Sequence, residues 1–329
     1  MNATEFNPPE MSVVLVTRTP FPSIRKTIRH LSRQTFRDRL ELLIVAPSRE
    51  ALALEDSEVQ GFSAARVLEV GPIRSMPEAK LAAVRNATTP VIAFAEDHCY
   101  PEPDWAEYLI KAHREKWAAV GPLLANANPN TLNSWTAYLM SHAHWNEPVK
   151  TGRVDSLPWH NTSYKRQLLL EYGSELPALL AAEGFLQQRL MEGGYELYLS
   201  PTAKVSHINA SRGASVISHA YIGGRVFGAK RAHYGKWSPL RRLLHIGATP
   251  LIPLVRLQRT CRDIFRIGQS KRLLPFVLPA LCAGLTFHAL GELVGYAFGI
   301  GDAELQFSSY EMSRIDHLTE HDRQVELAG

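Results

Sequence analysis

The stretch that most constrains the fold of this chain is an apolar run that leads directly into charged side chains. Val91–Phe94 has the length of a buried strand, and it runs into Glu96, Asp97 and His98. A Pro-x-Pro sequence then ends the strand, because proline cannot donate a ladder hydrogen bond. Open α/β sheets bind their ligands at the carboxyl ends of their strands. The sequence therefore predicts a ligand site at this strand end, although a plain polar turn is the alternative for three polar residues alone.

Further apolar runs of strand length alternate with helical patterns along the first part of the chain. The predicted strands are residues 11–17, 40–45, 65–70, 91–94 and 118–122. Such alternation indicates an α/β fold with a mostly parallel sheet and right-handed crossovers. The first strand is not followed by a Gly-x-Gly-x-x-Gly sequence, so a dinucleotide site is not expected.

The helices of this part are predicted from apolar periodicity and capping residues. Ser23 is expected to cap a helix that continues to about Gln34, and Asp104 to cap one beginning at Trp105. Further helices are predicted over residues 77–85 and 178–193, with short strands at 195–199 and 204–207. The ordered α/β part is expected to end near residue 210.

The C-terminal third has a different character. Between Arg225 and Arg272 there are twelve basic residues and a single acid, Asp263, in a chain whose net charge is only +4. Residues 273–300 are then almost wholly apolar and long enough to span a bilayer. Two prolines and Glu292 argue against a plain span, so an interfacial or re-entrant segment is the alternative. A buried helix pair of a soluble domain is a further, weaker alternative.

The cysteines and the two chain ends predict no further structural elements. Cys99, Cys261 and Cys282 are too far apart for a disulfide framework or a zinc motif, which favours a reducing compartment. Residues 1–10 are polar and contain no signal-peptide pattern, so we expect a flexible N-terminus. Residues 302–329 are charged and are expected to form a flexible tail.

Several motifs in order resemble glycosyltransferase family 2. The resemblance covers about residues 11–210 and rests on the spacing of its motifs together. They are Val13–Thr17 with Gln34-Thr35, Glu96-Asp97-His98 followed by Pro101-Glu-Pro103-Asp-Trp105, His160-Asn161-Thr-Ser163-Tyr-Lys-Arg166, Leu186-Gln-Gln-Arg189-Leu190 followed by Gly194-Tyr195, and Pro201 followed by Val205-Ser-His207.

The resemblance implies a GT-A fold over residues 11–210, a Rossmann-like, mostly parallel sheet flanked by helices. It also implies transfer of a sugar from a nucleotide-diphosphate-sugar donor to a hydroxyl of a glycan or lipid-linked acceptor, with inversion and help from Mn²⁺ or Mg²⁺. Residues 211–301 are expected to form a helical, membrane-associating region. This arrangement would place the enzyme at the cytoplasmic face of the cell membrane, as part of polysaccharide biosynthesis.

The chain departs from the family pattern at three places. Its second strand ends in Ala46-Pro47-Ser48 where the family has acids that hold the nucleotide base. The Asp-x-Asp motif is replaced by Glu96-Asp97-His98, and His98 retains the capacity to bind a metal as a neutral imidazole. The acidic pair of the later helix is reduced to Ala182-Glu183. These changes point to a different donor, a weakened metal site or a catalytically degenerate scaffold.

Roles for individual residues follow from the resemblance. Glu183 is the expected general base, which would deprotonate the acceptor hydroxyl. The remaining roles divide among three groups. The donor is expected to contact Thr17, Arg18, Lys80, Glu96 and Asp97, the acceptor to contact His160, Asn161 and Ser163, and the metal to be held by His98, His207 and Asp97.

A nucleic-acid-binding protein is the competing class, because the basic residues from Arg225 to Arg272 would suit phosphate. They are interleaved with Leu, Ile and Pro more than with stacking aromatics, and they adjoin an apolar segment. A membrane surface accounts for both features, whereas nucleic acid accounts for one. No nucleic-acid partner is therefore expected.

Overall fold

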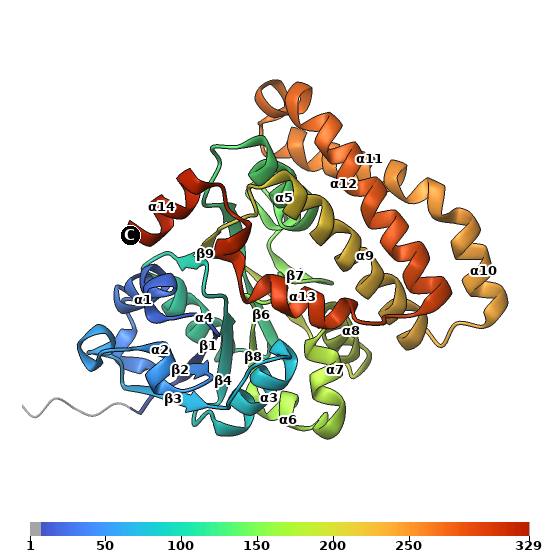
Figure 1. The fold of residues 1–329 in the computed structure, drawn as a ribbon. Helices are drawn as coiled ribbons and strands as arrows, with labels where there is room; N and C mark the ends of the chain where they lie inside the picture. Colours follow the sequence, from blue (N-terminus) through green and yellow to red (C-terminus); the bar gives the residue numbers. More distant parts are fainter. Residues whose placement is uncertain (1–7, 329) are drawn as a thin grey trace, which may run out of the picture. The chain divides into compact units, whose positions relative to one another are not determined.

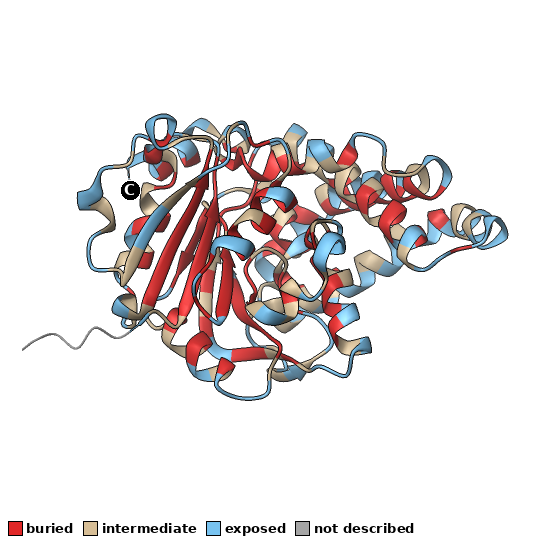
Figure 2. Cartoon of the chain, turned by 90° about the horizontal axis from the view of Figure 1, so that it is seen from below, coloured by how far each residue is buried: buried red, intermediate tan, exposed pale blue. Residues whose placement is uncertain are grey.

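The first predicted strand lies at the centre of the parallel half of a mixed sheet. In a computed structural model of the chain, which describes residues 8–328, β1 (Met11–Val16) pairs in parallel with β2 (Leu40–Ala46) and β4 (Val91–Ala95). β3 (Ala64–Glu69) pairs in parallel with β2. Every residue of β1 and β2 is buried, as expected for central parallel strands (Figure 2). The predicted fold class is confirmed, and these strand ends fall within one residue of prediction.

The rest of the sheet contains antiparallel pairs. β8 (Ser163–Lys165) pairs antiparallel with both β4 and β6 (Ala119–Asn126), and β9 (Leu197–His207) lies between β6 and β5 (Cys99–Pro101). β7 (Gly152–Val154) pairs with β9. The prediction of two short strands on either side of Pro201 was wrong, because β9 runs through this proline as one strand of eleven residues.

The helices of the α/β part follow the predicted order, with two differences at their N-termini. They are α1 (Arg25–Ser32), α2 (Arg49–Leu52), α3 (Met76–Asn86), α4 (Trp105–His113), α6 (Arg166–Leu170), α7 (Leu176–Leu180) and α8 (Glu183–Glu192). Ser23 does not cap α1, because its hydroxyl donates to the carbonyl of Pro20 and Ile24 takes the N-cap position. Asp104 takes the N-cap position of α4 but makes no side-chain capping bond.

The helix predicted over residues 178–193 is divided into α7 and α8. Ala182, at the N-cap of α8, has φ −152° and ψ 70°, which is far from helical. The break makes Glu183 the first residue of α8. This break could not be predicted from the residue at this position, because alanine favours the helical state more than any other residue.

The chain forms two compact units. The first contains residues up to Leu123 and Thr151–Ser206, and the second contains Leu124–Lys150 and His207–Ala328. The first unit carries the sheet, and β9 continues without a break to His207. The second unit is helical, with α5 (Leu132–Ser141), α9 (Gly213–Tyr234), α10 (Pro239–Ala248), α11 (Ile252–Arg266), α12 (Ser270–Phe298), α13 (Ala303–Glu311) and α14 (Glu320–Ala328) (Figure 1).

Within the second unit, α9 and α12 pack with their backbones in contact. A Cβ atom on Gly224 of α9 would lie 2.0 Å from the carbonyl oxygen of His288, and one on Gly291 of α12 would lie 2.1 Å from that of Tyr221. Only glycine permits this approach, and small residues on facing helices bring their backbones together in the same way in other proteins. The two helices are therefore fixed to each other along much of their length.

Both ends of the chain were predicted to be flexible. The predicted flexible N-terminus, residues 1–10, lies mostly outside the described residues. The expected flexible tail, residues 302–329, instead contains α13 and α14, and Ala303, Tyr310 and Met312 within it are buried. Charge misled the prediction here, because these helices also bury charged side chains, among them Glu311, Asp322 and Glu326.

Candidate active site

The carboxyl ends of β1, β2 and β4 meet at one edge of the sheet, because the three strands are parallel and in register. Thr17 follows β1 directly and is buried, with its hydroxyl 2.9 Å from that of Thr19. Arg18 beside it is exposed. Ser48, after β2, accepts a hydrogen bond from the backbone N–H of Ala51 and so caps α2. The ends of β1 and β2 thus offer a hydroxyl and a guanidinium, and the acids that the family has after its second strand are replaced.

Glu96, which follows β4, is buried at this edge and is held by two neighbours. The side-chain amide of Asn161 donates to Oε2 of Glu96 at 2.6 Å. The thiol of Cys99 donates to the same oxygen at 3.4 Å. Asn161 precedes β8, the antiparallel neighbour of β4, so the sheet itself brings a predicted acceptor residue to a predicted donor residue.

Cys99 and His207 also meet at the sheet edge, and strand pairing explains why. The backbone N–H of Glu102 donates to the carbonyl of Lys204 at 3.0 Å, which joins the end of β5 to β9. Cys99 lies three residues before this bond on β5, and His207 lies three residues after it on β9. The pairing of these adjacent strands therefore carries the two side chains to the same end of the sheet.

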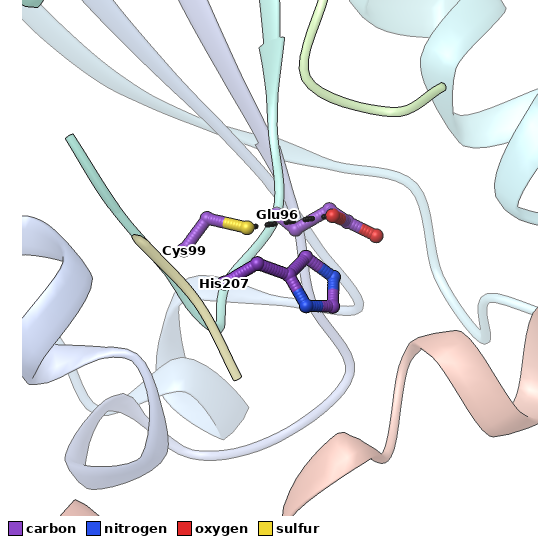
Figure 3. A group of neighbouring side chains, drawn as sticks. All are labelled: Glu96, Cys99 and His207. Carbon is purple, nitrogen blue, oxygen red and sulfur yellow. Dashed lines mark hydrogen bonds between the residues drawn. The ribbon is translucent and has the colours of Figure 1, made fainter. Parts of the chain in front are cut away.

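Glu96, Cys99 and His207 form a group of three buried candidate metal ligands (Figure 3). One ligand atom from each lies within 4.8 Å of the other two. Carboxylate suits Mg²⁺ and Mn²⁺, imidazole suits Zn²⁺ and several other transition metals, and thiolate favours Zn²⁺ among divalent ions. The donor set therefore fits a divalent cation. Cys99 was not predicted as a ligand, because the sequence showed neither a zinc spacing nor the strand that would place it here.

His98 and Asp97, the other predicted metal ligands, pair with each other. Nδ1 of His98 lies 2.9 Å from Oδ1 of Asp97, and Nε2 of His98 lies 3.7 Å from Oε1 of Glu96. The imidazole thus lies beside two carboxylates at the strand end. Among the described residues, the group around His207 includes neither His98 nor Asp97. Glu96 is the residue that both histidines share as a neighbour.

Glu183 is completely buried, and all its close polar partners come from the sheet unit. The ammonium of Lys80 on α3 donates to Oε1 at 2.7 Å, and Nδ1 of His160 lies 3.2 Å from the same oxygen. The hydroxyl of Tyr164 on β8 donates to Oε2 at 3.1 Å. Lys80 also lies 2.9 Å from Nδ1 of His160, so the three charged or titratable groups form one cluster.

These partners determine the charge of Glu183. Burial alone would raise the pKa of its carboxyl, but the positive charge of Lys80 and the contact with His160 lower the pKa to about 2. Burial, followed by the charge of Glu183, raises the pKa of the Tyr164 hydroxyl well above its ordinary value. At neutral pH the cluster therefore contains an ionised carboxylate beside a neutral phenol.

The backbone around the cluster is adapted to hold these side chains. His160 has φ +65°, a left-handed conformation that is uncommon for residues other than glycine and is often found at functional sites. A Cβ atom on Gly184 would lie 2.8 Å from the indole of Trp159. The glycine beside Glu183 thus permits close packing of the residue next to His160.

Ser163 differs from its neighbours in the predicted acceptor group. It is fully buried in β8, its hydroxyl donates to the carbonyl of Val120 at 2.9 Å, and it lies 2.8 Å from Nε2 of His113. These contacts give it a role inside the sheet. Tyr164, which sequence reasoning did not select, is instead the residue of this strand whose hydroxyl reaches Glu183.

A known protein family matches a part of the chain that excludes Glu183 and His207. Residues 12–171 match the family described as "Glycosyl transferase family 2". No curated protein is significantly similar in sequence. Among solved structures, the mannosyltransferase PcManGT from Pyrobaculum calidifontis, in complex with GDP-Man and Mn²⁺, is 17% identical, with a TM-score of 0.50 over 93% of this chain and 87% of that one.

Two further structures are similar at lower scores. S. aureus TarS (1–349) is 11% identical, with a TM-score of 0.47 over 92% of this chain and 90% of that one. GalNAc-T7 with UDP, GalNAc and Mn²⁺ is 14% identical, with a TM-score of 0.47 over 61% of this chain; the match spans 44% of GalNAc-T7. The chain therefore belongs to glycosyl transferase family 2 through residues 12–171, has the GT-A fold, and is a glycosyltransferase.

Proposed function

We propose that the protein transfers a sugar from a nucleotide-diphosphate-sugar donor to a hydroxyl of a glycan or lipid-linked acceptor, with inversion, at the cytoplasmic face of a membrane. The observation that carries this proposal is the placement of two separate carboxylates in the sheet unit. Glu96 lies at the strand ends, where such sheets bind ligands, and Glu183 lies beneath a lysine and a histidine. The donor diphosphate needs a carboxylate that can hold a cation, and the attacking hydroxyl needs a carboxylate that can accept its proton.

The donor end of the reaction needs cations. Charge develops on the departing diphosphate, and a divalent cation held by Glu96, His207 and Cys99 would neutralise it. Asp97 and His98 support this end as a pair beside Glu96. Thr17 and the exposed Arg18 lie at the same strand ends, where they suit the nucleotide and its phosphates. Mn²⁺ is the first ion to test, because PcManGT has been solved with it.

The acceptor end needs a group that takes a proton. We propose Glu183 as this base, with Asn161 and His160 beside the acceptor. Lys80 and His160 keep the carboxylate ionised, which is the state a base requires, although a pKa of about 2 makes it a weak base while they remain in place. Movement of Lys80 toward the donor phosphates would raise the pKa of Glu183. The carboxylate would then lose the positive charge that stabilises its ionised form, while burial would continue to favour the neutral form.

Binding of the donor is the first property to measure, by a thermal shift with UDP- and GDP-sugars in the presence and absence of Mn²⁺. We expect one nucleotide sugar to raise Tm, and to raise it more when Mn²⁺ is present. Stabilisation by an oligonucleotide alone would support a nucleic-acid-binding protein instead. Donor binding without turnover would support the degenerate scaffold that the altered motifs suggest.

Loss of the Glu96 carboxylate should weaken metal binding. We expect Glu96→Gln to lower Mn²⁺ affinity by at least about tenfold, since even the partners of metal ligands contribute that much. The measurement is titration with Mn²⁺, followed by the electron paramagnetic resonance of the free ion. Glu102→Gln is the control, because Glu102 is exposed just after β5 and its replacement should leave affinity unchanged. Equal affinities in the two variants would exclude Glu96 as a ligand.

Removal of the metal should also affect catalysis. EDTA should abolish turnover, and Mn²⁺ should restore it.

A further inference from the structure

The second unit exposes large apolar side chains on three consecutive helices. Soluble proteins rarely expose contiguous apolar patches beyond a few hundred Å². Leu243 on α10 and Phe276 on α12 are both 63% exposed, Phe287 is 42% exposed, and Phe298 is 79% exposed. The exposed apolar set, which we call the apolar face, comprises Leu240, Leu243 and Leu244 on α10, Leu251 just before α11, Leu254, Val255 and Phe265 on α11, and Phe276, Phe287, Leu290 and Phe298 on α12.

α12 has two faces of different kinds. One face packs against α9, and it includes the buried His288 and Glu292. The other face is exposed, and between Arg272 and Phe298 it carries no charged residue. The helix has 29 residues and a length of about 43 Å. Of the described helices, it is the one long and apolar enough to cross a membrane by these measures.

The charges around the apolar face are almost all positive. Residues 236–300 contain nine Lys or Arg and two acids. Glu292 is buried, and Asp263 pairs with Arg266 at 2.9 Å. The exposed cations are Lys236, Arg241, Arg259, Arg262, Lys271 and Arg272. Apolar side chains flanked by cations fit the boundary between acyl chains and anionic headgroups.

The packing of α12 against α9 argues against a transmembrane span. The backbones touch at the glycines described above, so α9 would have to enter the bilayer beside α12. α9 carries Arg225, Lys230 and Arg231, and cations in the hydrocarbon core are strongly disfavoured. A helix whose inner face is fixed to such a partner can present only its outer face to lipid.

We infer that the apolar face binds the surface of a bilayer rich in anionic phospholipids, with α10, α11 and α12 embedded at the interface and no segment crossing it. This inference rests on the proposed membrane role and specifies both its geometry and its lipid. A second copy of this chain would be a poor occupant of the same face, because it would bring the same exposed cations against these.

The test is flotation of the full chain with vesicles of phosphatidylcholine alone and of phosphatidylcholine with phosphatidylglycerol. We expect binding to the anionic vesicles, weaker binding as salt is raised, and release by an alkaline carbonate wash. Leu243→Ser with Phe276→Ser should lower the partition coefficient by at least about tenfold, because each buried side chain contributes a comparable factor. Leu305→Ser is the matched control, on α13 and 53% exposed.

Charge-reversal variants measure the electrostatic contribution to vesicle binding separately from the apolar contribution. Arg259→Glu with Arg262→Glu should lower binding to anionic vesicles by at least about tenfold, since each cation near such a surface contributes roughly fivefold. Arg33→Glu, an exposed change in the first unit, should have no effect. Equal binding to both vesicle types would overturn the anionic preference, and retention after carbonate would overturn the interfacial geometry.

Two other results would overturn the inference without touching the transferase proposal. One is a protein that stays wholly soluble with both vesicle types while it still shows a donor-induced rise in Tm. The other is a dimer in analytical ultracentrifugation that Leu243→Ser with Phe276→Ser dissociates, because a second copy would then cover the face. Conversely, vesicle binding without any donor-induced rise in Tm would contradict the transferase proposal alone.

Discussion

Replacing Glu183 with glutamine is expected to lower turnover by about 10²–10⁴-fold, which is the usual contribution of a general base. Glutamine keeps the size of the side chain, and its one carbonyl oxygen can still accept from Lys80, while its amide group faces the Tyr164 hydroxyl, which can accept from it. It cannot take a proton from the acceptor hydroxyl. Donor affinity should change little, because Glu96 and the strand ends lie apart from this carboxylate in the hydrogen-bond network. Steady-state kinetics with a donor titration measure both quantities.

The matched control for this variant is Glu192→Gln at the other end of the same helix. Glu192 is exposed and lies 3.8 Å from Arg189, so turnover should remain at the wild-type value. Near wild-type turnover in Glu183→Gln would refute the role of Glu183 as base. A parallel fall in donor affinity and turnover would show that Glu183 organises Lys80 and His160 and does not carry the proton.

Replacing Lys80 with methionine is expected to destabilise the protein by about 3–5 kcal/mol, as removal of one partner from a buried ion pair typically does. Lys80 and Glu183 are both buried and lie 2.7 Å apart. Methionine fills most of the space of the lysine stem but leaves the carboxylate without its main cation. Urea unfolding at neutral pH measures the free energy of unfolding, and a loss below about 1 kcal/mol would contradict the account.

Two comparisons isolate the ion pair from the other effects of this change. Lys111→Met breaks an exposed pair with Glu107 and should cost less than about 1 kcal/mol. Lys80→Met combined with Glu183→Gln should be less destabilised than Lys80→Met alone, because the unpaired charge is gone.

The stability that the wild-type Lys80–Glu183 pair contributes should also depend on pH. Since folding lowers the pKa of Glu183 from 4.5 to about 2, its contribution is complete above about pH 4.5 and is lost as the pH falls toward 2.

Much of the sheet could be predicted from the sequence, because a buried parallel strand is a short run of apolar residues in one chain segment. Met11–Val16 and Leu40–Ala46 are such runs. What the sequence could not indicate was any feature that depends on a partner distant along the chain. β9 passes through Pro201 because pairing with its neighbours holds it extended. α13 and α14 looked like a mobile tail because several of their buried side chains, Glu311, Asp322 and Glu326, are charged.

The candidate site shows the same limit. The motif order placed Glu96 and Glu183 in the same unit, but it could not show that Lys80 binds Glu183 across 103 residues of chain. Lys80 was predicted to contact the donor, and the structure gives it a carboxylate as its partner. Cys99 was read only as a thiol without a disulfide. The antiparallel edge of the sheet, which the sequence did not reveal, brings it to His207 and Glu96.

Turnover of a nucleotide sugar tests the central claim most directly. The full chain is incubated with Mn²⁺ and a panel of UDP-, GDP- and dTDP-sugars, with a lipid-linked or glycan acceptor, and the released nucleoside diphosphate is measured. We predict that one donor is turned over, that EDTA stops the release and Mn²⁺ restores it, and that Glu183→Gln lowers it while Glu192→Gln does not. Release at the background rate for every donor, from a folded wild-type protein whose Tm none of these donors raises, would contradict the account.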